Sequence, residues 1–275
     1  MSMLLSHYRR IWVIGASSGI GEALVKALDH PDRTVIVSAR NKAALESLAL
    51  ASSGPCLALP MDINQAEDVE AVCHALADQS PVDMVILNAG TCEYMDSTRL
   101  DLALLERVMQ TNFFSIVRLI DQALPMMRRA LGQGVKRPKL VVMSSSVTYQ
   151  ALPRAHAYGA SKSALRYFTE CLKADVQKEG IDVRIVSPGF VKTPLTDQND
   201  FEMPFRVSAQ DAAYEIIKGL EGERFDISFP KKFTLYLKAV ARLPDAWRFK
   251  ILGKMSRHAL TDVPETTHKS QDRSV

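Results

Sequence analysis

Residues 10–21 of the chain read RIWVIGASSGIG, an apolar run that ends in a glycine-rich turn. Such a run is typical of a strand that is buried on both faces, as in a parallel sheet. A second run of the same kind, RTVIVSAR, follows at residues 33–40. Between the two runs, apolar residues recur at helical spacing: Ile20, Ala23, Leu24, Ala27 and Leu28. The chain therefore begins with a strand, a glycine turn, a helix and a second strand.

Apolar runs and amphipathic stretches continue to alternate along the chain, which is the pattern of a parallel sheet. The sequence predicts an α/β fold, a single doubly wound (Rossmann) domain with a seven-stranded parallel sheet and helices on both faces. We place this domain at 1–230, a basic amphipathic helical extension at 231–258 and a disordered tail at 259–275. The further strands are expected at 56–63, 82–90, 139–146, 182–189 and 224–230, with helices at 65–77, from Asp101, around Tyr158 and from Ser208, which pairs with Asp211 as a cap.

The composition excludes several classes of function. Of the 275 residues, 47% are hydrophobic and 24% are charged, which is typical of a globular enzyme and not of a disordered chain. A net charge of +3 argues against a nucleic-acid partner. The four cysteines lie far apart without metal-ligand spacing, so we expect reduced thiols and no metal site. Because the chain shows neither a signal peptide nor an apolar stretch of about 18 residues, we expect a cytoplasmic protein.

The glycine turn suits a pyrophosphate group. Gly15, Gly19 and Gly21 allow a ligand to approach the backbone closely, and the following helix offers free N–H groups and a favourable dipole. A tight turn without a ligand is the alternative. The second strand ends at Arg40, and a basic residue there favours a ribose 2′-phosphate, whereas an acidic one would favour a 2′-hydroxyl. We expect NADP(H) as the preferred cofactor, with NAD(H) possible, unless Arg40 is a solvated surface residue.

The chain contains two Tyr-x-x-x-Lys pairs, Tyr158…Lys162 and Tyr214…Lys218. At this spacing both side chains of a pair lie on one face of a helix. A lysine charge nearby lowers the pKa of a tyrosine from about 10, which would suit the phenol for proton transfer near neutral pH. The first pair alone follows a strand that ends in serines, at 144–146. We therefore expect Tyr158 and Lys162 to carry chemistry, Tyr214 to pack on its helix and Lys218 to be solvated.

The ordered motifs of the chain resemble the short-chain dehydrogenase/reductase family over about residues 11–229. They are the glycine turn, LNAG at 87–90 in place of the usual N-N-A-G, Asn112, the serine cluster, Tyr158-x-x-x-Lys162, and SPGFVKT at 187–193. The resemblance implies an oxidoreductase that transfers a hydride between a nicotinamide and a carbonyl or alcohol. It also implies assembly as a homodimer or homotetramer.

The resemblance also implies residue roles. Tyr158 would be the catalytic acid/base, and Lys162 would lower its pKa and hold the nicotinamide ribose. Asn112 would complete a proton relay through water. A serine would bind the substrate oxygen, and its spacing of about thirteen residues from Tyr158 points to Ser145, with Ser144 as the alternative. The positions expected to bind the cofactor are Gly15, Ser17, Ser18, Gly19, Ile20, Gly21, Arg40, Asn41, Asp62, Ile63, Asn88, Ala89, Gly90, Tyr158, Lys162, Pro188, Gly189 and Thr193.

The segments that would meet the substrate are rich in apolar side chains, which favours a hydrophobic ketone or aldehyde over a sugar. These side chains are Leu152, Phe190, Leu195, Phe201, Met203 and Phe205. Two other functions remain as alternatives. One is an epimerase or dehydratase that uses the same Tyr/Lys pair, and the other is a noncatalytic NADP(H)-binding protein.

The extension at 231–258 has a strong basic character, with eight basic residues and one acid in 231–257. Helical spacing predicts one face with Phe233, Tyr236, Leu237 and Val240, opposite Lys231, Lys238 and Arg242, followed by a second helix from Pro244 with Trp247, Ile251 and Leu252. Such helices can pack over the substrate cleft or a partner subunit, or they can lie on an anionic membrane surface.

Overall fold

A computed structural model describes residues 5–77, 79–95, 97 and 100–256. Its centre is a seven-stranded parallel sheet in the order β3-β2-β1-β4-β5-β6-β7. Because the order reverses between β1 and β4, the sheet is doubly wound. The strands are β1 (Arg10–Ile14), β2 (Thr34–Ser38), β3 (Cys56–Ala58), β4 (Met84–Leu87), β5 (Lys139–Met143), β6 (Asp182–Pro188) and β7 (Asp226–Phe229).

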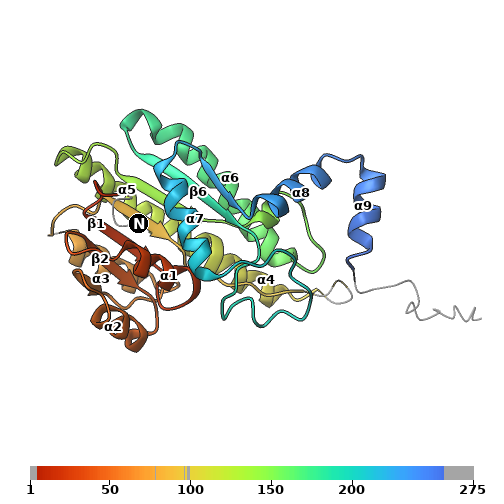
Figure 1. Ribbon diagram of the computed structural model, residues 1–275, viewed down its shortest axis with the longest axis horizontal. Coiled ribbons are helices and arrows are strands. Elements are labelled where there is room, and N and C mark those ends of the chain that lie inside the picture. Colours follow the sequence, from red (N-terminus) through yellow and green to blue (C-terminus); the bar gives the residue numbers. More distant parts are fainter. Residues whose placement is uncertain (1–4, 78, 96, 98–99, 257–275) are drawn as a thin grey trace, which may run out of the picture.

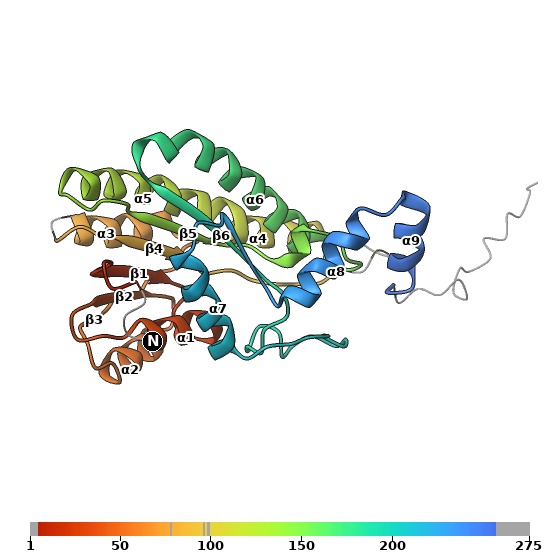
Figure 2. The same cartoon turned by 45° about the horizontal axis from the view of Figure 1, so that its top comes forward.

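Helices cover both faces of this sheet (Figures 1 and 2). The helices α1, α2 and α7 lie on one face, and α3, α5 and α6 lie on the other. The predicted α/β fold with a doubly wound parallel sheet is therefore confirmed. The helix bounds are α1 (Gly19–Leu28), α2 (Lys42–Leu50), α3 (Ala66–Ala77), α4 (Leu102–Met109), α5 (Ser115–Gly132), α6 (His156–Val176), α7 (Ala209–Glu221), α8 (Lys231–Ala241) and α9 (Asp245–Gly253).

The two faces of the sheet have separate hydrophobic cores. Val13 of β1 belongs to the core that packs α1 and α7, whereas its neighbour Trp12 belongs to the core that packs α3 and α5. Successive strand residues point to opposite faces, so one strand serves both cores. Trp12 is fully buried, and its indole donates a 2.9 Å hydrogen bond to the hydroxyl of Ser38 on β2.

The sequence-based prediction missed one helix and simplified another. The helix α2 was not expected, because its apolar face is short. All residues of this helix are described, and Leu45 and Leu48 are the two that are buried. The long helix expected from Asp101 is capped by that residue, whose carboxylate accepts from the backbone N–H of Leu104 at 2.9 Å. A π-helical turn, Gln110–Phe114, then separates α4 from α5.

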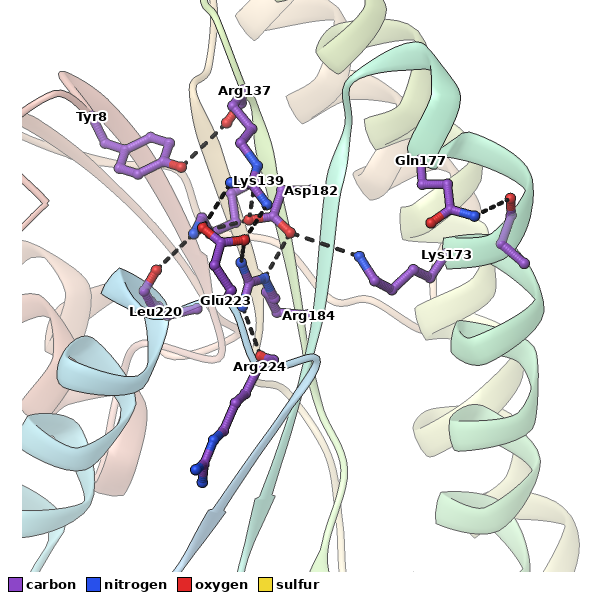
Figure 3. Close-up of polar contacts among 11 residues, drawn as sticks. Tyr8, Arg137, Lys139, Lys173, Gln177, Asp182, Arg184, Leu220, Glu223 and Arg224 are labelled. Carbon is purple, nitrogen blue, oxygen red and sulfur yellow. Dashed lines mark hydrogen bonds and ion pairs between the residues drawn. The ribbon is translucent and has the colours of Figure 1, made fainter.

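A buried charge cluster fixes the amino ends of two strands (Figure 3). Asp182 begins β6 and pairs in register with Lys139, which begins β5. The carboxylate of Asp182 lies 3.1 Å from the ammonium of Lys139 and 2.6 Å from the guanidinium of Arg184. The same two strands carry site residues at their carboxyl ends, so the cluster holds the scaffold from the opposite edge of the sheet.

The last described segment projects from the body of the molecule (Figures 1 and 2). The helix α8 buries Phe233, Thr234, Leu237 and Val240. Tyr236 was expected on this buried face, but it is half exposed, because it lies at the edge of the apolar stripe. Among the described residues, no helix combines the length and apolar character needed to cross a bilayer. The tail predicted at 259–275 lies outside the described residues.

Candidate active site

A cavity of about 1000 Å³ opens beyond the carboxyl ends of the strands. This is the position at which doubly wound sheets bind their ligands. The structure brings nearly all the predicted site residues together here, from the glycine turn after β1 to the segment after β6. Gly21 and Asn112 are the two predicted site residues that do not line the cavity, and both are buried behind its wall.

The glycine turn is shaped by close backbone contacts. Gly15 has a φ of +87°, a left-handed conformation that glycine adopts without strain. Its carbonyl accepts a 2.8 Å hydrogen bond from the side-chain amide of Asn88 in the LNAG segment. A Cβ added to Gly21 would lie 2.0 Å from the same carbonyl oxygen. The turn therefore needs glycine at both positions, and Asn88 holds it although the preceding position is Leu87.

The N-terminus of α1 faces the cavity and is open to a ligand. Ser17, Ser18, Gly19 and Ile20 line the cavity, and the side chain of Ser18 at the N-cap makes no capping hydrogen bond. A helix N-terminus of this kind attracts phosphate groups through free N–H groups and the helix dipole. Thr193 stands close by, since a Cβ on Gly19 would lie 2.9 Å from its methyl group.

The neighbouring strands supply the wall at which an adenosine would lie. Arg40 is exposed at the end of β2 and lines the cavity with Asn41, whose side chain caps α2 by accepting from Ala44 N–H at 3.1 Å. Asp62 and Ile63, after β3, line the same part of the wall. The glycine turn, the open helix end and the arginine together fit a dinucleotide phosphate.

Tyr158 and Ser145 meet in the same cavity. The hydroxyl of Ser145 is near enough to the phenol of Tyr158 to stabilise its phenolate as a donor, and it accepts from the backbone N–H of Val147 at 3.2 Å. Ser144 lines the cavity too, but its buried hydroxyl has no partner among the described residues. The geometry thus pairs Ser145, and not Ser144, with the tyrosine.

The predicted effect of Lys162 on Tyr158 is not met in this structure. Burial raises the pKa of Tyr158 well above its usual range, the nearby Cys92 raises it further, and the hydrogen bond from Ser145 lowers it in part. The ammonium of Lys162 instead donates a 2.9 Å hydrogen bond to the carbonyl of Met143 at the end of β5. Tyr158 is therefore set to hold its proton, as a proton donor must.

Burial also changes Lys162. It lowers the pKa of Lys162 to about 8, with Cys92 acting in the opposite direction. A Cβ on Gly90 would lie 3.3 Å from the ammonium and 3.0 Å from the side-chain oxygen of Asn112, so the LNAG segment passes closely over both groups. A buried ammonium group needs an anionic or polar partner, and a bound ligand can supply one.

Asn112 links two segments of the site through hydrogen bonds. Its side chain is fully buried, accepts from the backbone N–H of Thr91 at 2.8 Å and donates to the carbonyl of Thr91 at 2.8 Å and to the hydroxyl of Ser161 at 3.0 Å. It therefore ties α6 to the segment after β4. Asn112 lies within the π-helical turn, a distortion that is frequent at functional sites.

The segment that follows LNAG also belongs to the site, although none of its residues was predicted. Cys92 interacts electrostatically with both Tyr158 and Lys162, and burial raises its pKa to about 11. Glu93 and Arg107 line the cavity and form an ion pair with a 2.6 Å contact. The position of Cys92 and Glu93 shortly after the carboxyl end of β4 is the signal that would have revealed this segment.

Aromatic side chains gather beside the cavity. Phe201 packs against Tyr94 at 5.1 Å and Phe190 at 6.0 Å between ring centroids, and Phe190 contacts Phe233 of α8 at 5.3 Å. Leu195 lines the cavity itself. The other predicted substrate residues are placed differently: Leu152 lines a second cavity, and Phe205 is 55% exposed.

The second Tyr-Lys pair lies far from this chemistry. Tyr214 is 41% exposed on α7, so the expectation that it packs on its helix was wrong. The ammonium of Lys218 lies 5.7 Å from its ring centroid, which is a surface cation–π contact.

Comparison with known proteins assigns the family. The model of the family described as short chain dehydrogenase matches residues 9–203. The chain belongs to the short-chain dehydrogenase/reductase family and is an NAD(P)-dependent oxidoreductase. An uncharacterized oxidoreductase of Myxococcus xanthus is 31% identical over 242 residues, which cover 86% of this chain and 94% of the relative. A rhamnolipids biosynthesis 3-oxoacyl-[acyl-carrier-protein] reductase of Pseudomonas aeruginosa is 31% identical over 189 residues, which cover 67% and 73%.

Solved structures share the fold. A short-chain dehydrogenase of Sphingobium yanoikuyae in complex with NADPH has a TM-score of 0.73 at 21% identity and covers 92% of this chain and 99% of its own. A short-chain dehydrogenase/reductase of Burkholderia phymatum in complex with NAD has a TM-score of 0.74 at 19% identity and covers 84% and 92%. The two neighbours hold different cofactors, so the fold alone leaves the preference open.

Proposed function

We propose that the protein is an NADP(H)-dependent carbonyl reductase or alcohol dehydrogenase for a hydrophobic ketone or aldehyde, with Tyr158 as its proton donor. The observation that carries this proposal is that Tyr158 and Ser145, whose hydroxyl acts on the pKa of the phenol, line the same cavity as the glycine turn and Arg40. Acid/base chemistry and dinucleotide recognition thus share one space.

The side chains suit a carbonyl reduction. The cofactor supplies the hydride when bound. Ser145 and Tyr158 then place two hydroxyl groups where a carbonyl oxygen gains negative charge, and such preorganised donors lower the barrier to reaction. The raised pKa of Tyr158 keeps it protonated before the reaction, and Lys162 places a buried amine in the same cavity, where it can hold a bound ligand.

Arg40 supports a preference for NADP(H). It is the basic residue at the end of β2 that lines the cavity, and a guanidinium binds a 2′-phosphate through charge-assisted hydrogen bonds. We expect Arg40→Ala to raise KM for NADPH roughly tenfold and to leave KM for NADH nearly unchanged. Lys42→Ala is the matched control, since Lys42 is exposed two residues away and pairs with Glu46. A wild-type enzyme that prefers NADH would refute this part of the proposal.

The aromatic group beside the cavity supports an apolar substrate. Phe190, Phe201 and Tyr94 form an edge-packed cluster, and Leu195 reaches the cavity. The Pseudomonas aeruginosa relative is named as a reductase of a 3-oxoacyl compound, which is in keeping with such a wall. A series of linear ketones with NADPH tests this: kcat/KM should rise with chain length, and a better rate with sugars would overturn it.

We also propose a homodimer or homotetramer. Phe114 ends the π-helical turn before α5, and Tyr167 lies on α6; they are 54% and 74% exposed. Large exposed aromatic side chains of this kind are enriched in subunit interfaces. Light scattering on the purified chain should give a multiple of its 30.5 kDa mass, and Tyr167→Glu should lower that multiple.

A further inference from the structure

The C-terminal arm, residues 231–256, exposes several large apolar side chains. Within Asp245–Gly253, all of which the structure describes, Leu252 alone is buried. Trp247 is 67% exposed and Met255 is 52% exposed, and on α8 Leu235 is 63% exposed. An amphipathic helix normally gains its stability by burying such groups, so the arm lacks a surface to cover them.

The arm is also held away from the body. A second cavity, of about 690 Å³, lies between the inner side of α9 and the segment that links β5 to α6. Arg248, Phe249 and Leu252 line this cavity from α9. Trp247 and Lys250 lie on the other side of the helix, and Lys254, its C-cap residue, continues the same helical spacing. The exposed face of α9 therefore combines an aromatic side chain with two lysines.

The charge of the chain is concentrated in the same place. Residues 231–257 hold eight of the 34 basic residues and one of the 31 acidic residues, so the rest of the chain has 26 basic against 30 acidic residues. The whole positive excess of the protein thus lies in one projecting segment (Figures 1 and 2). Two positively charged arms repel each other. This repulsion disfavours a second copy of the arm as the surface that covers the exposed apolar side chains.

We propose that the exposed face of α9, supported by the basic residues of α8, docks the enzyme on an anionic lipid bilayer. Helices that lie in a bilayer interface carry lysines and arginines for the headgroups and Trp, Phe or Leu for the acyl boundary. The arm has this combination, with Trp247 and Met255 beside Lys250 and Lys254. Nucleic acid offers the negative charge but no apolar layer for Trp247 and Met255 to enter, so the bilayer fits better.

The two tryptophans of the chain provide a direct test. Trp12 is fully buried in the sheet, and Trp247 is exposed on α9, so a change in emission caused by vesicles reports on Trp247. With full-length protein and vesicles of phosphatidylglycerol and phosphatidylcholine at low salt, we expect a blue shift and co-sedimentation. Vesicles of phosphatidylcholine alone should give neither, and Trp247→Phe should abolish the blue shift.

Charge variants test the surface itself. Lys250→Gln with Lys254→Gln should weaken vesicle affinity roughly 25-fold, about fivefold for each lysine. The matched control is Lys136→Gln with Lys178→Gln, which removes the same charge near the amino ends of β5 and β6 and should leave binding unchanged. Both double variants should reduce a water-soluble ketone at the wild-type rate, which shows that they are folded.

Several outcomes would overturn the proposal. One is a wild-type chain that does not bind phosphatidylglycerol vesicles at low salt, and another is equal loss of binding in the two lysine variants. A blue shift of Trp247 that grows with protein concentration in the absence of lipid would identify a second copy as the occupant. Binding to a DNA duplex with no binding to vesicles would identify a polyanion instead.

Discussion

The ammonium of Lys162 donates a 2.9 Å hydrogen bond to the carbonyl oxygen of Met143, at the point where β5 ends and the serine cluster begins. The bond couples the helix that carries Tyr158 to the strand that leads to Ser145. It also holds the ammonium of Lys162 in a buried position. The stability of the cofactor-free enzyme therefore depends on the protonation of this side chain.

Lys162→Met should stabilise the cofactor-free protein while abolishing activity. The pKa of Lys162 is about 8 in the folded protein against its ordinary 10.5, so between these values the unfolded chain holds a proton that the folded one has lost. The folded state is thus penalised below pH 8, and the penalty fades as pH rises to 10.5. At pH 7 we expect the variant to gain about 1–2 kcal/mol after loss of the Met143 hydrogen bond.

Urea unfolding at pH 7 and pH 10 measures this effect. The gain should shrink at the higher pH, because wild-type Lys162 is neutral there in the folded protein. Lys218→Met, at an exposed position on α7, is the control and should show no such pH dependence. An equal free-energy difference at both pH values would contradict the buried-cation account.

Asp182→Asn should destabilise the protein without touching the cavity. Burial opposes ionisation of Asp182, but the hydrogen bond from Arg184 and the charge of Lys139 hold its pKa below the ordinary value. Removing the carboxylate leaves buried cations unpaired, which costs about 3–5 kcal/mol at pH 7. The wild-type advantage should be present above pH 4 and be lost as pH falls through the lowered pKa of Asp182.

Thermal unfolding of Asp182→Asn between pH 3 and pH 7 tests this prediction. Glu179→Gln, which breaks the exposed ion pair with Arg128, is the control and should change the melting temperature little. A melting temperature for Asp182→Asn equal to that of wild type at pH 7 would show that the cluster contributes nothing.

The fold and most of the site follow from local patterns in the sequence. Buried strands such as β1 read as continuous apolar runs, and in a parallel sheet their carboxyl ends meet at one edge, so Gly15, Asn88 and Ser145 could be placed together in advance. The helix α2 has too narrow an apolar face to be recognised, and Asn41 caps it through an ordinary polar contact.

Other features depend on three-dimensional environment and leave no local trace. The shift in the pKa of Tyr158 comes from burial and from Cys92, a residue far away in the sequence. The burial of Asn112 comes from contacts with Thr91 and Ser161, which no spacing rule connects. Tyr214 is a large aromatic residue, a type that is expected to pack, but the face it occupies on α7 is turned to solvent.

Ser145→Ala and Ser144→Ala should differ sharply. The hydroxyl of Ser145 acts on the phenol of Tyr158, whereas the hydroxyl of Ser144 has no partner among the described residues. Loss of one preorganised donor should lower kcat by roughly 10²–10³ in Ser145→Ala with NADPH affinity kept. Steady-state kinetics and fluorescence titration with NADPH separate the two effects. A collapse of turnover in Ser144→Ala with Ser145→Ala active would reverse the assignment.

Tyr158 as the proton donor is tested most directly by a single-turnover measurement of NADPH oxidation by a ketone, comparing Tyr158→Phe with Tyr214→Phe. Both changes remove one phenolic hydroxyl from a helical Tyr-x-x-x-Lys pair, but the second is made on the exposed face of α7. We expect Tyr158→Phe to slow the oxidation by roughly 10²–10⁴ while still binding NADPH, and Tyr214→Phe to match wild type. A Tyr158→Phe enzyme that oxidises NADPH at the wild-type rate would contradict the proposed mechanism.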